Sequence, residues 1–145
     1  MTGGWKTAAL LVAALSACTA PEEAAVVTGP GGLNLRATWQ ANLSGAANGS
    51  GQLADYGAYF DAELTFSGGA AGTAYQWRIF NGTCAAPGLQ FGPNQAYPNF
   101  TTNGSGTAQV ERTVSGPLNL TAPYNVRVST VAAPVTIVAC GDLQH

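Results

Sequence analysis

Few residues of this chain have side chains that could act as acid–base catalysts, nucleophiles or metal ligands. The carboxylates Asp55, Asp61 and Glu63 could serve as a general acid and base, but two of them simply share one face of a predicted strand. Serine and threonine are abundant, yet the one histidine, His145, is the terminal residue and offers no usable base, so no Ser-His-Asp triad is predicted. Asp142 and His145 would offer a metal only two ligands near a chain terminus. These residues predict neither a catalytic nor a metal site.

Three arginines, Arg36, Arg78 and Arg127, fall on the polar faces of predicted strands. Together they could bind an anion or a carboxylate. Alternatively, they could pair with acidic residues, and Asp61 and Glu63 are available for this. The sequence leaves both alternatives open.

The best candidate for a recognition surface combines Gln76 and Arg78 with the aromatic residues of the segment 82–104, Tyr97 above all. These aromatic residues could instead pack against the fold and hold the long segment in place. The candidate surface therefore depends on whether Tyr97 is exposed.

Composition narrows the class of protein. The length of 145 residues fits one domain of ordinary size after removal of a targeting segment. Apolar residues make up 46% and charged residues 8%, which gives enough material for a core and favours a globular chain. The formal net charge of −2 offers no electrostatic basis for binding nucleic acid.

The N-terminus has the pattern of an export signal. Lys6 is followed by an apolar stretch at 7–15, which is shorter than the roughly 20 residues that span a bilayer as a helix. Residues 15–18 (LSAC) resemble the bacterial lipobox, in which the cysteine is lipidated and becomes the new N-terminus. The alternative is a simple secretory signal that happens to contain a cysteine. The lipobox resemblance implies lipidation of Cys18 with several acyl chains, palmitate among them. Several chains anchor stably, whereas one chain anchors only marginally.

The cysteine count agrees with this interpretation. Three cysteines leave one unpaired, and lipidation of Cys18 leaves Cys84 and Cys140 to form a disulfide in an oxidising compartment. Residue 19 is Thr rather than the Asp that retains many lipoproteins at the inner membrane, which favours the outer membrane. The predicted organisation is a signal peptide at 1–17, a flexible tether at 18–32 and a domain at 33–145.

Alternating apolar and polar residues predict an all-β domain. The alternation is clearest at 33–43 and 56–66, with a turn-rich break at 44–51 and a separate short strand at 50–55. Further strands are predicted at 75–79, 106–114, 124–128 and 135–139, and Arg112 marks a bulge or an edge position. Trp77 is expected in the core, and Cys140 is expected on the outer face. Seven to eight short strands indicate an antiparallel sandwich or flattened barrel.

Several short motifs resemble the Cu/Zn superoxide dismutase-like superfamily, and the chain is also similar to the chordin-type repeat branch of bacterial proteins. The motifs are YQWRIF at 75–80, Cys84, GSGTA at 104–108 and ACGD at 139–142. The resemblance covers about residues 33 to 143. It implies an eight-stranded Greek-key sandwich and a bridge from Cys84 to Cys140.

The chain departs from the dismutase pattern at the metal ligands. Gln76, Trp77 and Arg78 replace the His-x-His motif, and Ile137 replaces the active-site arginine. A copper–zinc pair needs several imidazoles, and a guanidinium offers a cation no lone pair. No cofactor is therefore predicted.

The sequence as a whole predicts a non-catalytic lipoprotein of the bacterial cell envelope whose β-sandwich binds or scaffolds an envelope ligand or protein. Its lipid anchor would attach it to the membrane. The alternative is a divergent dismutase-family enzyme or metal-handling protein with a relocated site. A carbohydrate-binding sandwich that uses exposed tyrosine and tryptophan is a third hypothesis.

Overall fold

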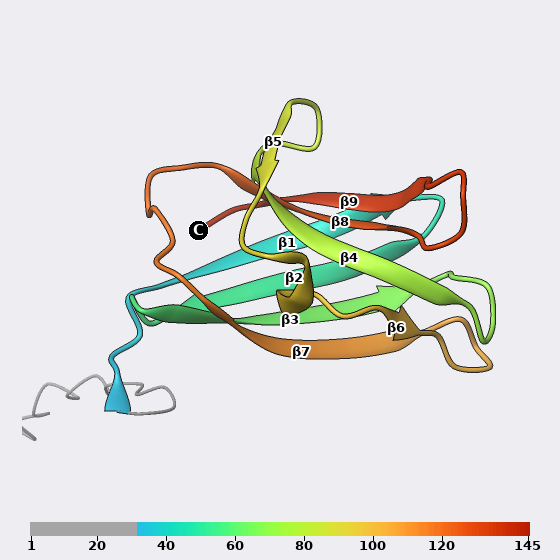
Figure 1. Ribbon diagram of the computed structural model, residues 1–145, viewed down its shortest axis with the longest axis horizontal. Helices are drawn as coiled ribbons and strands as arrows, with labels where there is room; N and C mark the ends of the chain where they lie inside the picture. Colours follow the sequence, from blue (N-terminus) through green and yellow to red (C-terminus); the bar gives the residue numbers. More distant parts are fainter. Residues whose placement is uncertain (1–31) are drawn as a thin grey trace, which may run out of the picture.

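The computed structural model describes residues 32–145 (Figure 1). The signal peptide predicted for 1–17, the lipidation site Cys18 and all but the last residue of the tether predicted for 18–32 lie outside the described residues. The predicted domain, 33–145, falls entirely within them.

The regular secondary structure of the described residues is almost entirely β-strand. In order these are β1 (Ala37–Gly45), β2 (Asn48–Asp55), β3 (Tyr59–Ser67), β4 (Ala74–Gly82), β5 (Pro87–Gln90), the 3₁₀ helix η2 (Asn94–Ala96), β6 (Phe100–Thr101), β7 (Ala108–Ser115), β8 (Tyr124–Thr130) and β9 (Ile137–Leu143). No helix in this part of the chain could span a membrane. The predicted all-β class is confirmed.

The strands form one curled antiparallel sheet with the order β5-β4-β8-β9-β1-β2-β3-β7, and β6 pairs with β4. Strands distant in sequence become neighbours at β3–β7, β4–β8 and β9–β1, which gives the predicted Greek-key connectivity. Between β1 and β9 only Ser44–Cys140 and Gly45–Ala139 pair directly, and Gln40 and Gln144 exchange backbone hydrogen bonds further along. The sheet is therefore a flattened half-barrel whose two halves meet at β1 and β9.

The core fills the space between the two halves, because every long strand turns alternate residues inward. Each half contributes large, almost fully buried side chains: Trp39, Leu53, Phe60, Leu64 and Phe66 from β1–β3, and Trp77, Ile79, Val126 and Val128 from β4 and β8. The prediction that Trp77 lies in the core is confirmed.

The turn-rich break predicted at 44–51 is wrong for most of its length. Strand β1 continues to Gly45, and β2 already begins at Asn48. Gly49 lies so close to β3 that a Cβ atom there would overlap the carbonyl oxygen of Thr65. This glycine therefore marks a close approach of two strands rather than a turn.

The ends of the first and last strands also differ from the prediction. Strand β1 begins at Ala37 rather than at residue 33, and Leu33 is exposed. Strand β9 runs from Ile137 to Leu143 instead of occupying 135–139. A register shift opposite Val128 and Ser129 places Ile137 outside, whereas Ala139 points inward. Cys140 then lies on the outer face, as its parity predicted.

Strand β7 forms one edge of the sheet, which confirms the interpretation of Arg112 as an edge residue. The long segment between β4 and β7 is held down by its aromatic side chains. Phe91 packs against Phe60, with 5.5 Å between ring centroids, and Phe100 packs against Phe66 at 5.4 Å. The segment is therefore anchored on the core at several points along its length.

Candidate functional site

Gln76 and Arg78 lie on the outer face of β4, because their neighbours Tyr75, Trp77 and Ile79 point into the core. Arg127 lies on the outer face of β8, where it alternates with the buried Val126 and Val128. In the pairing of β4 with β8, Arg78 stands directly opposite Arg127. Two of the three arginines considered from the sequence are thus brought together.

The Arg78 guanidinium is fixed by acceptors on its own strand and on the long loop. Its Nη1 donates to the carbonyl of Trp77 at 2.7 Å and to the carbonyl of Tyr97 at 3.0 Å, and Nη2 donates to Oε1 of Gln76 at 3.3 Å. Burial lowers the pKa of Arg78, and the neighbouring Tyr97 partly opposes this effect. The side chain is therefore partly desolvated and held in one position.

The Arg127 guanidinium is held in a similar way. Its Nε donates to Oδ1 of Asn125 at 3.0 Å, and Nη2 donates to the carbonyl of Cys84 at 2.8 Å. The guanidinium carbon lies 5.4 Å from the centre of the Phe80 ring, within cation–π distance. Within residues 32–145, Nε of Arg78 and Nη1 of Arg127 have no hydrogen-bond partner.

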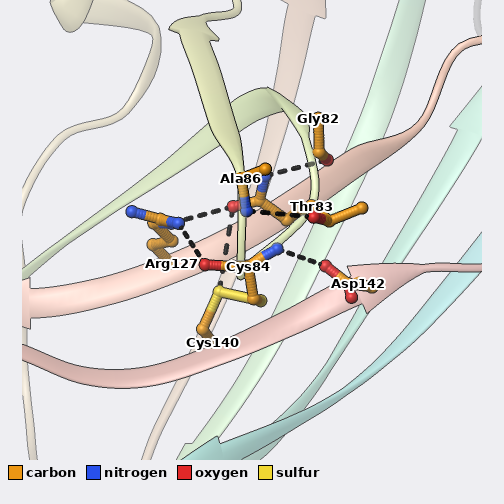
Figure 2. Close-up of a disulfide and its surroundings, with 8 residues drawn as sticks. Gly82, Thr83, Cys84, Ala86, Arg127, Cys140 and Asp142 are labelled. Carbon is orange, nitrogen blue, oxygen red and sulfur yellow. Dashed lines mark hydrogen bonds between the residues drawn. A yellow bond between two sulfur atoms is a disulfide. The ribbon is translucent and has the colours of Figure 1, made fainter.

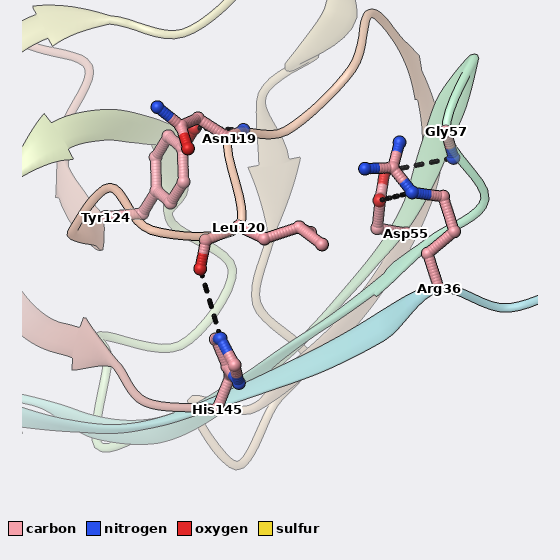
Figure 3. A network of polar contacts seen from close by, with 7 residues as sticks. All are labelled: Arg36, Asp55, Gly57, Asn119, Leu120, Tyr124 and His145. Carbon is pink, nitrogen blue, oxygen red and sulfur yellow. Dashed lines mark hydrogen bonds and ion pairs between the residues drawn. The ribbon is translucent and has the colours of Figure 1, made fainter.

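The third arginine, Arg36, lies beside Asp55 (Figure 3). Nε of Arg36 lies 3.5 Å from Oδ2 of the fully buried Asp55, whose Oδ1 accepts a hydrogen bond from the amide of Gly57. This is the one ion pair that the described residues contain. Arg36 therefore has an acidic partner, whereas Arg78 and Arg127 do not. The expectation that Asp61 or Glu63 would pair with these arginines is wrong.

A shallow groove of about 450 Å³ opens beside the two arginines. We call it the arginine groove; its lining residues are Gln76, Arg78, Phe80, Gln90, Asn94, Arg127, Ser129, Val135 and Ile137. The lining contains two cations, several amides and exposed apolar side chains, but no carboxylate. Its electrostatic character is therefore positive, although the whole chain carries a net charge of −2.

The disulfide predicted between Cys84 and Cys140 is present, with 6.0 Å between the Cα atoms. It fastens the loop after β4 to the outer face of β9, and Figure 2 shows Arg127 and Asp142 on either side of it. Asp142 accepts a hydrogen bond from the amide of Cys84, while the Cys84 carbonyl accepts from Arg127. The crosslink thus positions a carbonyl that orients one of the two arginines.

Tyr97 does not contribute its side chain to the surface. The ring is 1% exposed and packs edge-on against Trp77, with 5.0 Å between centroids. Its hydroxyl donates to the carbonyl of Phe91 at 2.6 Å, and burial raises its pKa. The prediction that the Tyr97 side chain belongs to an exposed recognition surface is therefore wrong, because Tyr97 is a core residue. Only its backbone carbonyl contributes to the candidate surface, where it accepts a hydrogen bond from Arg78.

Asp61, Asp142 and His145, which were candidates for catalysis or metal binding, have structural partners, whereas Glu63 is exposed on β3. Asp61 accepts a hydrogen bond from Thr113 at 2.6 Å. His145 contacts the carbonyl of Leu120 at 3.1 Å (Figure 3). Its ring also packs against Trp39, whereas Asp142 is bonded to the Cys84 amide. Between residues 32 and 145 no group of three or more His, Cys, Asp and Glu side chains is placed to hold a metal.

The aromatic residues expected for a carbohydrate site are mostly in the core. Trp39, Trp77, Tyr75, Tyr97 and Tyr124 are all buried. A second hollow, about 620 Å³, lies on the outer face of β1–β3 and is lined mainly by amide, hydroxyl and carboxylate side chains without an aromatic ring. Neither this hollow nor the arginine groove is lined by a tyrosine or tryptophan ring on which a sugar could stack.

The sequence did not identify Phe80, Gln90, Asn94, Ser129, Val135 and Ile137 as neighbours of Arg78. Strand parity could have placed Phe80 and Ser129 on the same face as Gln76. Phe80 is four residues after Gln76 on β4, and Ser129 on β8 stands directly opposite Gln76. Nothing in the sequence pattern indicated that Val135 and Ile137 would be exposed, since their alternation with Ala139 suggested the core.

Comparison of the chain with protein-family models, with curated proteins and with solved structures gave no match. The arginine groove is therefore the basis for a functional proposal.

Proposed function

We propose that the domain is a non-catalytic binding module of a bacterial cell-envelope lipoprotein and that the arginine groove is its recognition site. The observation that carries this proposal is the pair Arg78 and Arg127, which face each other across β4 and β8 without an acidic partner. Both guanidiniums are held by hydrogen bonds, and each keeps one nitrogen without a hydrogen-bond partner within residues 32–145. Such an arrangement suits the binding of a partner better than it suits the stability of the fold.

The chemistry of the lining supports a binding role rather than catalysis. The groove is lined by amides, guanidiniums, one hydroxyl and apolar groups. Arginine stays protonated, so it cannot act as a general base, and Ser129 has no base in the lining to activate it. Proton transfer near neutral pH therefore has no suitable group at this site.

The kinship with the dismutase-like superfamily is part of the proposal. The resemblance implied a Greek-key sandwich and a bridge between Cys84 and Cys140, and both features are present. Gln76 and Arg78 occupy the positions where the resemblance expects His-x-His, and both are on the outer face of β4. An amide and a cation at these positions favour a module that has lost metal chemistry.

The proposed location is the bacterial cell envelope, with a lipid anchor at Cys18 and the outer membrane favoured by Thr19. The disulfide supports export, because such bonds persist in oxidising compartments. The partner would then be a ligand or protein of the same envelope.

The test of this function uses the full chain carrying Cys18→Ser, which removes the proposed anchor, and envelope fragments from the bacterium that carries the protein. We expect the chain to co-sediment with the fragments and the Arg78→Gln/Arg127→Gln double variant to lose most of this binding. The exposed Arg112 on β7 supplies a matched control, since Arg112→Gln removes the same charge from a residue that does not line the groove. Equal binding by the double variant would show that the groove is not the recognition site.

A second measurement separates this proposal from the alternative of a relocated metal site. The metal content of the purified full chain and its superoxide consumption with added copper are determined together. We expect no stoichiometric copper or zinc and no activity above that of free copper. Stoichiometric metal with activity that depends on the protein would contradict the binding-module proposal.

A further inference from the structure

The arginine groove contains two cations, and no carboxylate of the described residues lines it or forms an ion pair with them. Like charges placed directly opposite each other destabilise an antiparallel pair of strands, and Arg78 and Arg127 occupy such a position. Arg36, in contrast, has the carboxylate of Asp55 beside it. A bound anion would remove the repulsion at the groove, which is the first reason to expect one there.

The two guanidiniums are prepared for an anion by their existing contacts. Backbone carbonyls of Trp77, Tyr97 and Cys84 fix their positions, so binding would not have to order two long side chains. The N–H groups left over are charged donors, which form stronger hydrogen bonds with a carboxylate than neutral donors do.

The apolar part of the lining restricts what the anion can be attached to. Val135 is 59% exposed and Ile137 is 51% exposed, and both line the groove next to the arginines. A small, strongly hydrated oxyanion such as phosphate would leave these side chains without a contact. A carboxylate that carries an aliphatic group could engage the arginines and cover the apolar side chains together.

We propose that the arginine groove binds a carboxylate with an adjoining apolar substituent, as found in a peptide that ends in an aliphatic residue. This inference rests on the proposed function of the domain as a binding module and names the chemistry of its ligand. Arg78 and Arg127 hold the carboxylate, and Val135 and Ile137 contact the apolar substituent. The side-chain amide of Asn94, which makes no hydrogen bond within residues 32–145, is available to the adjoining peptide group, whereas the Gln76 amide is already bonded to Arg78 and to the Thr130 carbonyl.

The experiment follows backbone amide signals by NMR while N-acetyl-leucine is added to the full chain carrying Cys18→Ser. We expect saturable shifts centred on Arg78, Arg127, Ser129 and Ile137. N-acetyl-leucinamide has the same apolar group without the charge. We expect its affinity to be lower by about tenfold or more, because it cannot form the charge-assisted hydrogen bonds that the carboxylate forms. Equal affinity for the two compounds would overturn the proposal.

Variants assign each part of the site, and the NMR spectrum itself reports whether each variant is folded. Arg127→Gln and Arg127→Lys should both weaken binding, because lysine keeps the charge but loses the planar fork. Arg112→Gln should bind like the parent chain. Acetate has the carboxylate without the apolar group, so the parent chain should bind N-acetyl-leucine more tightly than acetate. Ile137→Ser, at an exposed position, should abolish this preference. Unchanged binding by the Arg127 variants would contradict the assignment.

Inorganic phosphate forms the last arm of the test. Binding of phosphate as tight as that of N-acetyl-leucine would show a general anion site and overturn the carboxylate assignment. The metal and activity measurements are independent of these titrations. A chain without metal that also fails to bind N-acetyl-leucine would therefore refute this inference alone, whereas a metal-loaded active chain would refute the proposed function.

Discussion

Tyr97 shows how a single side chain joins the core to the groove. Its ring packs against Trp77, its hydroxyl bonds to Phe91, and its carbonyl positions Arg78. The indole N–H of Trp77 has no hydrogen-bond partner. Of the polar side-chain atoms of Trp77 and Tyr97, only the Tyr97 hydroxyl makes a hydrogen bond. Removal of this hydroxyl should therefore lower the stability of the fold.

Replacement Tyr97→Phe keeps the ring but removes this hydroxyl, so we expect a loss of about 1 kcal/mol in the free energy of unfolding at pH 7. The pH dependence should also change. An unfolded tyrosine loses its proton near pH 10, whereas burial raises the pKa of Tyr97 in the folded chain. The folded state then binds more protons above about pH 10, and stability falls as the pH rises.

Urea unfolding at pH 7, 10 and 11 measures both effects. The parent chain should lose stability above about pH 10 with a slope steeper by up to about 1.4 kcal/mol per pH unit than that of Tyr97→Phe. Identical slopes for the two chains would show that Tyr97 titrates in the same way in its folded and unfolded states, and the role assigned to its burial would be wrong.

Among the strands, the contact between β2 and β3 depends on a residue without a side chain. A Cβ atom at Gly49 would overlap the Thr65 carbonyl. We expect Gly49→Ala to reduce the free energy of unfolding by about 1–3 kcal/mol, because the two backbones would have to separate. Gly104→Ala is the control, since nothing lies within 4 Å of a Cβ there. A chemical unfolding curve in which both variants match the parent would contradict the close approach.

The disulfide should stabilise the fold and also preserve the groove. The two cysteines are 56 residues apart, and closing a loop of this length is worth about 4 kcal/mol in the chain-entropy model. The Cys84→Ser/Cys140→Ser double variant should be less stable by about this amount. It should also bind N-acetyl-leucine more weakly, because the Cys84 carbonyl orients Arg127. Unfolding and NMR titrations check the two effects separately, and an unchanged unfolding midpoint would refute the stabilising role.

For the molecule as a whole, the proposed anchor at Cys18 decides where the protein is found. We expect Cys18→Ser to release the protein from the membrane fraction, because the substitution removes the site of the acyl chains. Cell fractionation measures the release, and the mass of the mature N-terminal peptide should reveal acyl chains on Cys18. A mature chain that begins elsewhere, or that carries an unmodified Cys18, would refute the lipoprotein assignment.

Much of the fold could be predicted because burial imposes a period of two on each strand. The alternation at Trp39, Ala41 and Leu43 and that at Tyr124, Val126 and Val128 each predicted the correct inner face. The prediction failed at 44–51, where the glycines suggested a turn but allow two strands to approach closely. Local composition does not distinguish these two uses of glycine.

The sequence by itself determined that the domain is an all-β shell, that Cys84 and Cys140 were available to pair, and that the imidazoles needed for a dismutase-type metal pair are missing. Alternation and residue type suffice for such conclusions. Only the tertiary structure decided that Arg78 meets Arg127 and not Arg36, that Tyr97 is buried, and that Ile137 faces outward. These depend on which strands become neighbours and on a register shift, and both are set by contacts between residues far apart in the chain.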